Sequence, residues 1–355
     1  MAEQKFINIG IIGVGGIAMG THYNELKNIK NCKIAAICDT DTNRLKERGD
    51  ILGIPEELRF TDYKQLIDCD KIDAVEVCTP NNWHPEMAAY AIEKGKPVNI
   101  EKPLGLSVEH AKVILDAQEK YGTDAMVCFS YRFKSAVRYA KKLLSENAIG
   151  DILGVNVKYL KDSGLWEGRR LEWRFQKEYG GTGVLGDLGV HLIDMCTFLV
   201  GDIKQVFGKL DIIVKKRQRL DSDEWADVTT DDACNFIATL ENGATANFSI
   251  SRCVLGHSNT ITFEIFGTDG IIAFDLNHPD ELQVCIGTAD KECGGGLHKL
   301  KVPGKYGISQ EGSFVEIARG NEPVCHPTVK DGIKCQKILD AVLLSSETGK
   351  AVDIV

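Results

Sequence analysis

Short apolar runs alternate with helical patterns through the first third of the chain. The runs lie at 6–12, 33–38, 74–78, 97–100 and 125–129. Most of them lack polar alternation, as do strands of a parallel sheet that is buried on both faces. Amphipathic patterns between the runs predict helices at 16–28, 41–52, 62–68, 84–94 and 107–121. This order of strands and helices predicts an open α/β sheet.

After about residue 150 the apolar positions recur with period two. Segments 154–160, 244–251 and 261–266 place apolar and polar side chains in alternation, which is typical of strands with one buried face. Asn242-Gly243 and Asp269-Gly270 are hairpin signals suited to turns with positive φ. This half is therefore predicted to form a mostly antiparallel sheet, whose open face is a plausible oligomer interface.

Two helices accompany this second sheet. One is expected near 187–200, where it interrupts the strands. The other is the final helix, at about 330–348, which we expect to pack back on the first domain. A length of 355 residues fits about two domains.

Composition excludes several classes of protein. Hydrophobic residues make up 43% and charged residues 26% of the chain, so it is not wholly disordered. A net charge of −9 argues against a nucleic-acid or anionic-membrane binder. The twelve cysteines contain no Cys-x-x-Cys pair, so reduced thiols and no metal site are expected. The start of the chain has no apolar signal-peptide core, and a cytoplasmic location is expected.

A glycine-rich turn directly follows the first predicted strand. Gly13-Val14-Gly15-Gly16-Ile17-Ala18 matches the G-x-G-x-x-A fingerprint of dinucleotide-binding folds. Gly13 permits a tight turn, Gly15 lets a pyrophosphate approach the backbone, and Ala18 allows close helix packing. The helix that follows would direct its N-terminus at the phosphates.

Asp39 ends the second predicted strand, 21 residues beyond Ala18. A carboxylate at this place accepts hydrogen bonds from the adenosine ribose and repels a 2′-phosphate. Arg44 is within reach of that region, although a solvated helix charge is the commoner role for such a residue. NAD is therefore expected rather than NADP.

Two further motifs follow the third and fourth strands. Thr79-Pro80-Asn81 and His84 come after 74–78, where open α/β sheets bind their ligands, although plain helix initiation explains them equally well. Glu101-Lys102-Pro103 comes directly after 97–100. It delivers a lysine to the same sheet edge, near the expected cationic nicotinamide.

The fourth motif is the glycine-rich segment 180–195. Asp187, His191 and Asp194 are spaced +4 and +3, which places them on one face of a helix. Five glycines precede or enter this helix, consistent with backbone pressed against a ligand. From composition alone, a core histidine beside Asp187 is the commoner explanation of His191.

Together and in this order, the four motifs resemble those of the Gfo/Idh/MocA oxidoreductases, and the resemblance covers essentially the whole chain. It implies a Rossmann NAD-binding domain at 1–124 and a substrate-binding and oligomerisation domain at 125–329. It also implies a homodimer or homotetramer and hydride transfer between a sugar or cyclic polyol, such as an inositol, aldose or glycoside, and nicotinamide.

The resemblance assigns roles to individual residues. Lys102 matches the family's catalytic lysine, and Asp187 and His191 match its substrate-binding aspartate and catalytic histidine. Lys102-Pro103 is expected to be a cis peptide. Weaker matches near the substrate are Tyr131, Arg132, Trp173 and Arg174. The expected cofactor-binding residues are Gly13, Gly15, Gly16, Ile17, Asp39, Thr79, Pro80, Asn81, His84, Glu101 and Lys102.

The motifs lead to one preferred hypothesis and two alternatives. In the preferred one, His191 accepts the hydroxyl proton, Lys102 stabilises the alkoxide and hydride passes to NAD. The first alternative is an NAD-dependent glycoside hydrolase with redox-neutral turnover. The second is a non-enzymatic NAD-sensing regulator, which would need none of Lys102, Asp187 and His191.

Overall fold

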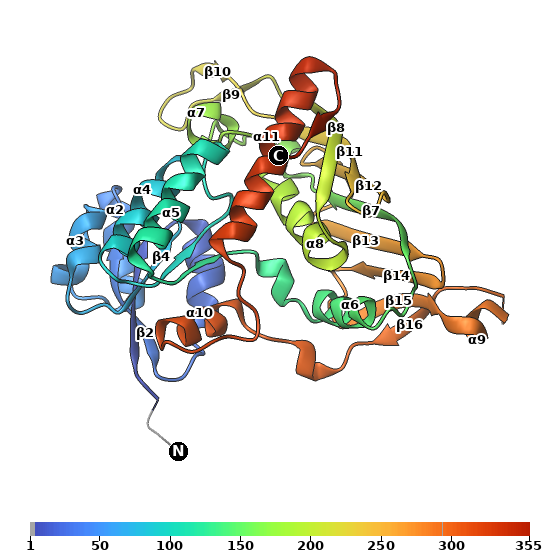
Figure 1. Ribbon diagram of the computed structural model, residues 1–355. Helices are drawn as coiled ribbons and strands as arrows, with labels where there is room; N and C mark the ends of the chain where they lie inside the picture. The colour runs from blue at the N-terminus through green and yellow to red at the C-terminus, as the bar shows by residue number, and fades with distance from the viewer. Residues whose placement is uncertain (1–3, 293) are drawn as a thin grey trace. The chain divides into compact units, whose positions relative to one another are not determined.

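The computed structural model describes residues 4–292 and 294–355 (Figure 1). The chain forms two compact units, each made of separate stretches of sequence. The first comprises Met1–Cys128 and Ser309–Ile333, and the second Phe129–Ile308 and Lys334–Val355. The limits of 1–124 and 125–329 stay a prediction.

The first unit contains the expected parallel sheet. Its order is β3-β2-β1-β4-β5-β6, with every neighbouring pair parallel. This is the doubly wound Rossmann order, and its direction reverses between β1 and β4. The strands are β1 (Ile7–Ile12), β2 (Cys32–Cys38), β3 (Arg59–Phe60), β4 (Ala74–Val77), β5 (Val98–Ile100) and β6 (Ala125–Val127). Only the two-residue β3 was missing from the prediction.

Helices join these strands at the predicted places. They are α1 (Tyr23–Leu26), α2 (Thr42–Leu52), α3 (Tyr63–Asp68), α4 (His84–Glu93) and α5 (Val108–Tyr121). A π-helical turn, Ala18–His22, directly precedes α1. Later in the chain α10 (Gln310–Ala318) belongs to the same unit, where Ser309 donates a hydrogen bond to Glu25.

The second unit is built on a nine-stranded sheet of order β16-β15-β14-β13-β7-β12-β11-β8-β17. Among its pairs only β7 with β12 is parallel, which makes the sheet mixed but mostly antiparallel, as expected. The strands are β7 (Ile152–Leu160), β8 (Ile203–Asp211), β11 (Ala233–Leu240), β12 (Thr245–Ser251), β13 (Thr260–Gly267), β14 (Gly270–Asp275), β15 (Glu281–Ile286), β16 (His298–Lys301) and β17 (Val352–Asp353).

Helices α6 (Ser135–Ser145) and α8 (Val190–Val200) contact this sheet. The remaining elements are the ribbon of β9 (Lys216–Gln218) and β10 (Trp225–Asp227), short helices α7 (Lys177–Gly180) and α9 (Gly287–Glu292), and the long α11 (Val329–Thr348). Within the second unit the end of α11 packs on β8, where Ser345 accepts a hydrogen bond from the Gly208 amide.

The two hairpin glycines differ in conformation. Gly243 has the predicted positive φ of 87°, between β11 and β12. Gly270 is not among the residues with positive φ. A Cβ there would lie 2.2 Å from the Cys285 carbonyl oxygen of β15, so close strand approach is what requires glycine.

The stretch Lys177–Val200 has the length and apolar composition to cross a membrane. However, 78% of its most apolar window is buried inside the protein, as in the core helix of a water-soluble domain. No disulfide bond joins the cysteines that the structure describes. Cys293 lies outside the described residues.

Candidate functional site

The glycine turn lies at the point where the strand order of the first sheet reverses. Gly13 has a φ of 86°, and a Cβ on it would lie 2.7 Å from the carbonyl oxygen of Cys78, just after β4. By contrast, Gly15 and Gly16 face open space, with nothing within 4 Å of an added Cβ. Ile17 is exposed beside them. The turn thus offers bare backbone at a helix N-terminus, which suits a pyrophosphate.

Asp39 links the end of β2 to this turn. One carboxylate oxygen accepts a hydrogen bond from the Val14 amide at 3.0 Å, and the other from the Asp41 amide at 2.9 Å. Arg44 Nη1 donates to both oxygens at 3.2 Å. Arg44 therefore reaches the expected ribose position and is not simply a solvated helix charge. The carboxylate placement fits the adenosine ribose of NAD.

His84 connects the turn after β4 with the turn after β5. Its Nε2 lies 2.9 Å from the Thr79 carbonyl oxygen, and its Nδ1 lies 2.8 Å from that of Pro103. Burial lowers the pKa of this imidazole. Pro80 and Asn81 begin the short 3₁₀ turn that precedes α4. Both ring nitrogens of His84 thus contact the protein's own backbone, and cofactor contact by His84 stays a prediction.

The Lys102–Pro103 peptide bond is cis, as the resemblance implied. On the other side of Lys102, the Glu101 side chain turns into the protein. Its Oε2 accepts a hydrogen bond from the Lys102 backbone amide at 3.2 Å, and its Oε1 lies 3.1 Å from His22 Nε2. The residue before Lys102 is therefore held by a buried contact between Glu101 and His22.

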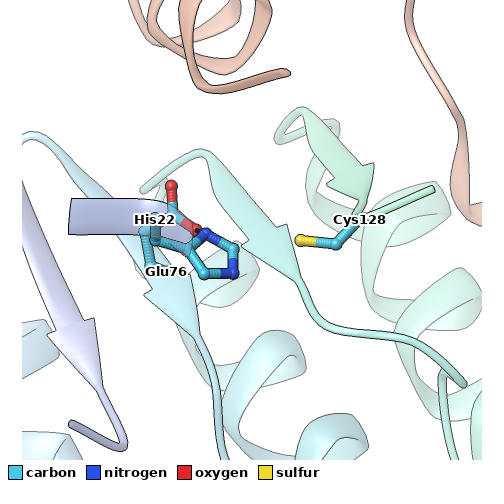
Figure 2. A group of neighbouring side chains, drawn as sticks. All are labelled: His22, Glu76 and Cys128. Carbon is cyan, nitrogen blue, oxygen red and sulfur yellow. Dashed lines mark ion pairs between the residues drawn. The ribbon is translucent and has the colours of Figure 1, made fainter. Parts of the chain in front are cut away.

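His22 is the centre of a buried cluster that the motif search missed (Figure 2). Its Nδ1 lies 3.0 Å from both Glu76 Oε2 and Glu311 Oε1. All three side chains are fully buried. A sequence signal was present, because Glu76 interrupts the apolar strand AVEVC, and a carboxylate inside a buried strand needs a polar partner.

Charge balance in this cluster is set by the carboxylates. Burial works to lower the pKa of His22, but Cys78, Glu311 and Glu76 outweigh it and raise the pKa well above its ordinary value. Burial also raises the pKa of the Cys78 thiol to about 12, so that group is neutral near pH 7. Burial works to raise the pKa of Glu311, but His22 outweighs it and lowers that pKa, so Glu311 supplies negative charge. Burial, followed by Glu311, raises the pKa of Glu76. His22 is thus an imidazolium.

In the second unit, Asp187 lies in a π-helical turn, Leu185–Gly189, and His191 lies at the start of α8. The Tyr131 ring stands edge-on to the His191 ring, with 4.6 Å between centroids. Arg174 Nε lies 3.9 Å from Asp187 Oδ1, and its guanidinium stacks over Trp173. These contacts link Tyr131 to His191, and Arg174 to both Asp187 and Trp173.

A second tyrosine extends this group. Tyr159 of β7 shares a hydrogen bond of 3.0 Å with the Tyr131 hydroxyl and donates one to Asn259. Burial raises the pKa of both phenols, and the Asp187 carboxylate adds to the effect. Both hydroxyls therefore keep their protons at neutral pH. Tyr159 was found in the sequence only as an apolar position of the strand.

Asp194 and Arg132 form a buried ion pair instead of joining this group. Arg132 Nε lies 3.0 and 2.9 Å from the two Asp194 carboxylate oxygens, and Nη2 lies 2.5 Å from one of them. Arg132 is 7% and Asp194 1% exposed. Substrate binding by Arg132 stays a prediction, while its guanidinium has a clear structural partner.

Gly183 and Gly189 of segment 180–195 pack closely against protein, which accounts for these two glycines without a ligand; the expected ligand contact of this segment stays a prediction. A Cβ on Gly183 would lie 1.9 Å from the carbonyl oxygen of Asp231, and one on Gly189 would lie 3.0 Å from Ile250. The Asp231 carboxylate accepts hydrogen bonds from the Gly183 and Leu185 amides, at 2.5 and 2.8 Å. These contacts fix the turn that carries Asp187.

Comparison with known proteins identifies both parts of the chain. Residues 7–129 match the model of an oxidoreductase family with an NAD-binding Rossmann fold, and residues 137–273 match the GFO/IDH/MocA C-terminal domain. Levoglucosan dehydrogenase of Pseudarthrobacter phenanthrenivorans is 34% identical over 325 residues, 83% of each chain. Glucose-6-phosphate 3-dehydrogenase of Bacillus subtilis is 28% identical over 339 residues, 94% of each.

A solved structure of levoglucosan dehydrogenase in complex with NADH and levoglucosan has the same fold. Its TM-score is 0.88 at 32% identity, covering 98% of this chain and 99% of that one. A Rossmann unit with an open glycine turn and a second unit with a mixed sheet are therefore combined as in these relatives. The chain belongs to the Gfo/Idh/MocA family of NAD-binding oxidoreductases.

Proposed function

We propose that this protein is an NAD-dependent dehydrogenase that oxidises a hydroxyl carbon of a sugar. The observations that carry the proposal are the contacts of Asp187, His191, Tyr131 and Arg174 in the second unit and the open glycine turn of the first. Relatives named for levoglucosan and glucose-6-phosphate dehydrogenation support a sugar over the inositols.

In the proposed reaction the substrate loses a hydride from carbon and a proton from oxygen. Bound NAD⁺ supplies the hydride acceptor, the C4 atom of nicotinamide. His191 takes the hydroxyl proton as the C–O bond becomes a carbonyl. Lys102 donates a hydrogen bond to the alkoxide oxygen, so its charge acts mainly in the transition state. The products are a keto sugar, NADH and a proton.

The other predicted residues bind and orient. Asp187 accepts hydrogen bonds from substrate hydroxyls, and Arg174 lies beside it, 3.9 Å from Oδ1. Tyr131 fixes the plane of the His191 ring through its edge-on contact. Asp39 binds the adenosine ribose, and Gly13, Gly15, Gly16 and Ile17 form the pyrophosphate turn. Thr79, Pro80, Asn81, His84 and Glu101 shape the nicotinamide end.

A substrate panel tests this proposal. Purified protein is mixed with NAD⁺ or NADP⁺ and with levoglucosan, aldoses, sugar phosphates, glycosides, uronates or inositols, and NADH formation is followed by absorbance. We expect NADH with at least one neutral sugar. We also expect less activity with NADP⁺, because the Asp39 carboxylate repels a 2′-phosphate. If no sugar leads to NADH formation, the proposed dehydrogenase activity is wrong.

The same panel separates the two alternatives. A redox-neutral glycoside hydrolase would release sugar from a glycoside without net NADH. A sensor would bind NADH and turn over nothing. Sugar release is therefore measured beside absorbance, and NADH binding is measured by fluorescence.

We further propose that a second copy of the chain covers the open face of the nine-stranded sheet. A hollow of about 750 Å³ lies on this sheet, lined in part by Phe207 and Ile237, each 50% exposed. Apolar side chains exposed together in this way mark an interface. Ile237→Arg is expected to turn a dimer or tetramer into smaller species, measured as solution mass by light scattering. Unchanged mass in Ile237→Arg, with Lys112→Arg on an exposed helix as control, would contradict this interface.

A cytoplasmic location completes the proposal. It is supported by the absence of disulfide bonds among the cysteines that the structure describes, because reduced thiols are typical of that compartment.

A further inference from the structure

The His22 cluster is enclosed within the first unit, and the roles proposed above use Glu101 but not His22, Glu76 or Glu311. His22 comes from the π-helical turn, Glu76 from β4 and Glu311 from α10, while Glu101 follows β5. Figure 2 shows His22 and Glu76 facing each other, with Cys128 nearby at the end of β6. Burying so many ionisable groups is costly, so their retention needs an explanation.

Carboxyl oxygens lie beside both nitrogens of the imidazole. Its Nδ1 lies 3.0 Å from two carboxylate oxygens, and its Nε2 lies 3.1 Å from a third. The Nε2 atom is hydrogen-bonded to Glu101, and the acidic side chains beside Nδ1 favour the charged form of the imidazole. His22 is therefore a buried cation that joins Glu76 and Glu311 on one side to Glu101 on the other.

A metal ion explains the cluster less well. His22, Glu76 and Cys128 offer ligand atoms within 4.8 Å of one another. However, both His22 nitrogens already contact carboxylates at hydrogen-bond distance. The Cys128 thiol donates to Asn99 Oδ1 at 3.2 Å, and burial raises its pKa well above the ordinary value, so it stays a thiol instead of a metal-binding thiolate.

Glu101 connects the His22 cluster to the neighbouring residue Lys102. The Glu101 carboxylate bridges His22 Nε2 and the Lys102 amide. One residue further along, the Pro103 carbonyl oxygen contacts His84. A buried histidine therefore contacts the residue on either side of Lys102, which itself lies in a bend after β5.

We propose that His22 is a positioning residue for Lys102. Its imidazolium holds the Glu101 carboxylate, and that carboxylate fixes the Lys102 backbone, so that the ammonium reaches the substrate oxygen in one orientation. Glu76 and Glu311 lie at the other imidazole nitrogen, on the side away from Glu101. This inference rests on the proposed role of Lys102 in sugar oxidation.

The test compares His22→Leu with His22→Gln in the full-length protein, using NAD⁺ and levoglucosan or the most active sugar of the panel. His22→Leu removes the contact with Glu101, and kcat is expected to fall about 10–100-fold, as misplacement of a catalytic group by ~1 Å does. NADH affinity should stay within about threefold. His22→Gln keeps an N–H donor for Glu101 and should recover most of kcat.

The matched control is Glu311→Gln, which changes the same buried cluster on the side away from Lys102. It keeps a side chain of the same shape beside His22 Nδ1 and leaves the hydrogen bond between His22 Nε2 and Glu101 intact. Its thermal stability should fall while kcat stays within about threefold of wild type. If kcat and thermal stability fall to the same extent in His22→Leu and in Glu311→Gln, His22 has only a structural role and the proposal is overturned.

Two further measurements keep the test decisive. If His22→Leu does not fold, His22→Leu/Glu311→Leu removes the cation together with one anion, and the same loss of kcat is expected. Metal analysis of the wild type must find less than stoichiometric metal, because one bound ion per chain would overturn the hydrogen-bonded arrangement.

A readout without turnover separates this inference from the proposed function. Reductive ¹³C-methylation labels the lysines, and the Lys102 NMR signal is assigned from its loss in Lys102→Arg. His22→Leu should shift or broaden that signal, and Glu311→Gln should not. If Lys102→Ala stays fully active, the proposed function fails, and this signal alone decides the positioning. An unchanged signal in His22→Leu overturns it.

Discussion

Lys102→Ala is expected to lower kcat by about 10²–10³-fold, the loss typical for removing one electrostatic donor from a transition state. The substitution removes the ammonium proposed to stabilise the alkoxide, while the glycine turn and Asp39 still bind the cofactor. NADH affinity should therefore change by only a few-fold. Steady-state kinetics with the active sugar and NADH fluorescence measure the two quantities.

Two variants complete this experiment. Lys112→Ala, on an exposed position of α5, removes a lysine from the same unit and should leave kcat unchanged. His191→Ala should reduce kcat by about 10²–10⁴-fold, because it removes the proposed proton acceptor. Near wild-type kcat in both Lys102→Ala and His191→Ala, with NAD still bound, would exclude the proposed mechanism.

Arg132→Leu is expected to reduce the free energy of unfolding by about 3–5 kcal/mol, because it leaves the Asp194 carboxylate buried without its cation. The guanidinium also lies over the Phe198 ring, with 5.0 Å to the centroid. Urea unfolding measures the loss. Arg132→Leu/Asp194→Leu, which removes both charges, should recover much of it.

The matched control for this variant is Arg174→Leu. Its side chain is 33% exposed and lies beside Asp187 instead of inside the core. We expect Arg174→Leu to raise KM for the sugar with little change in stability. If Arg132→Leu instead raises KM while stability stays unchanged, Arg132 binds substrate as the family resemblance implied.

The sequence predicted those parts of the fold whose signals are local. The strands of the first unit are apolar on both faces, and their ends were placed within two residues of the observed ones. Likewise, period-two alternation located β7, β12 and β13. The two-residue β3 was missed because Arg59 and Phe60 are too few to show any pattern.

The site was predicted less completely, because its partners are distant in sequence. The spacing of Asp187, His191 and Asp194 suggested one shared face. However, a π-helical turn carries Asp187, and Asp194 pairs with Arg132, 62 residues away. No spacing rule finds such a pair. Gly183 was predicted to contact a ligand because a glycine indicates a close neighbour without identifying it. In the structure that neighbour is Asp231.

The buried histidine was missed for the same reason. Glu76 in an apolar strand showed that a polar partner was needed, but Glu311 lies near the other end of the chain. Such a partner is visible only after the fold brings the segments together.

The discontinuous first unit has a consequence for synthesis on the ribosome. Arg319 donates a hydrogen bond to the Lys5 carbonyl oxygen, across 314 residues, and the Val127 amide donates to that of Pro327. At roughly 5–20 residues per second, the ribosome needs on the order of 15–60 s to make the intervening chain. The parallel sheet is therefore synthesised well before α10, and His22 has no contact with Glu311 until α10 has been made. The earliest part of the nascent chain is the last to be completed, and for that interval it is the part most in need of a chaperone.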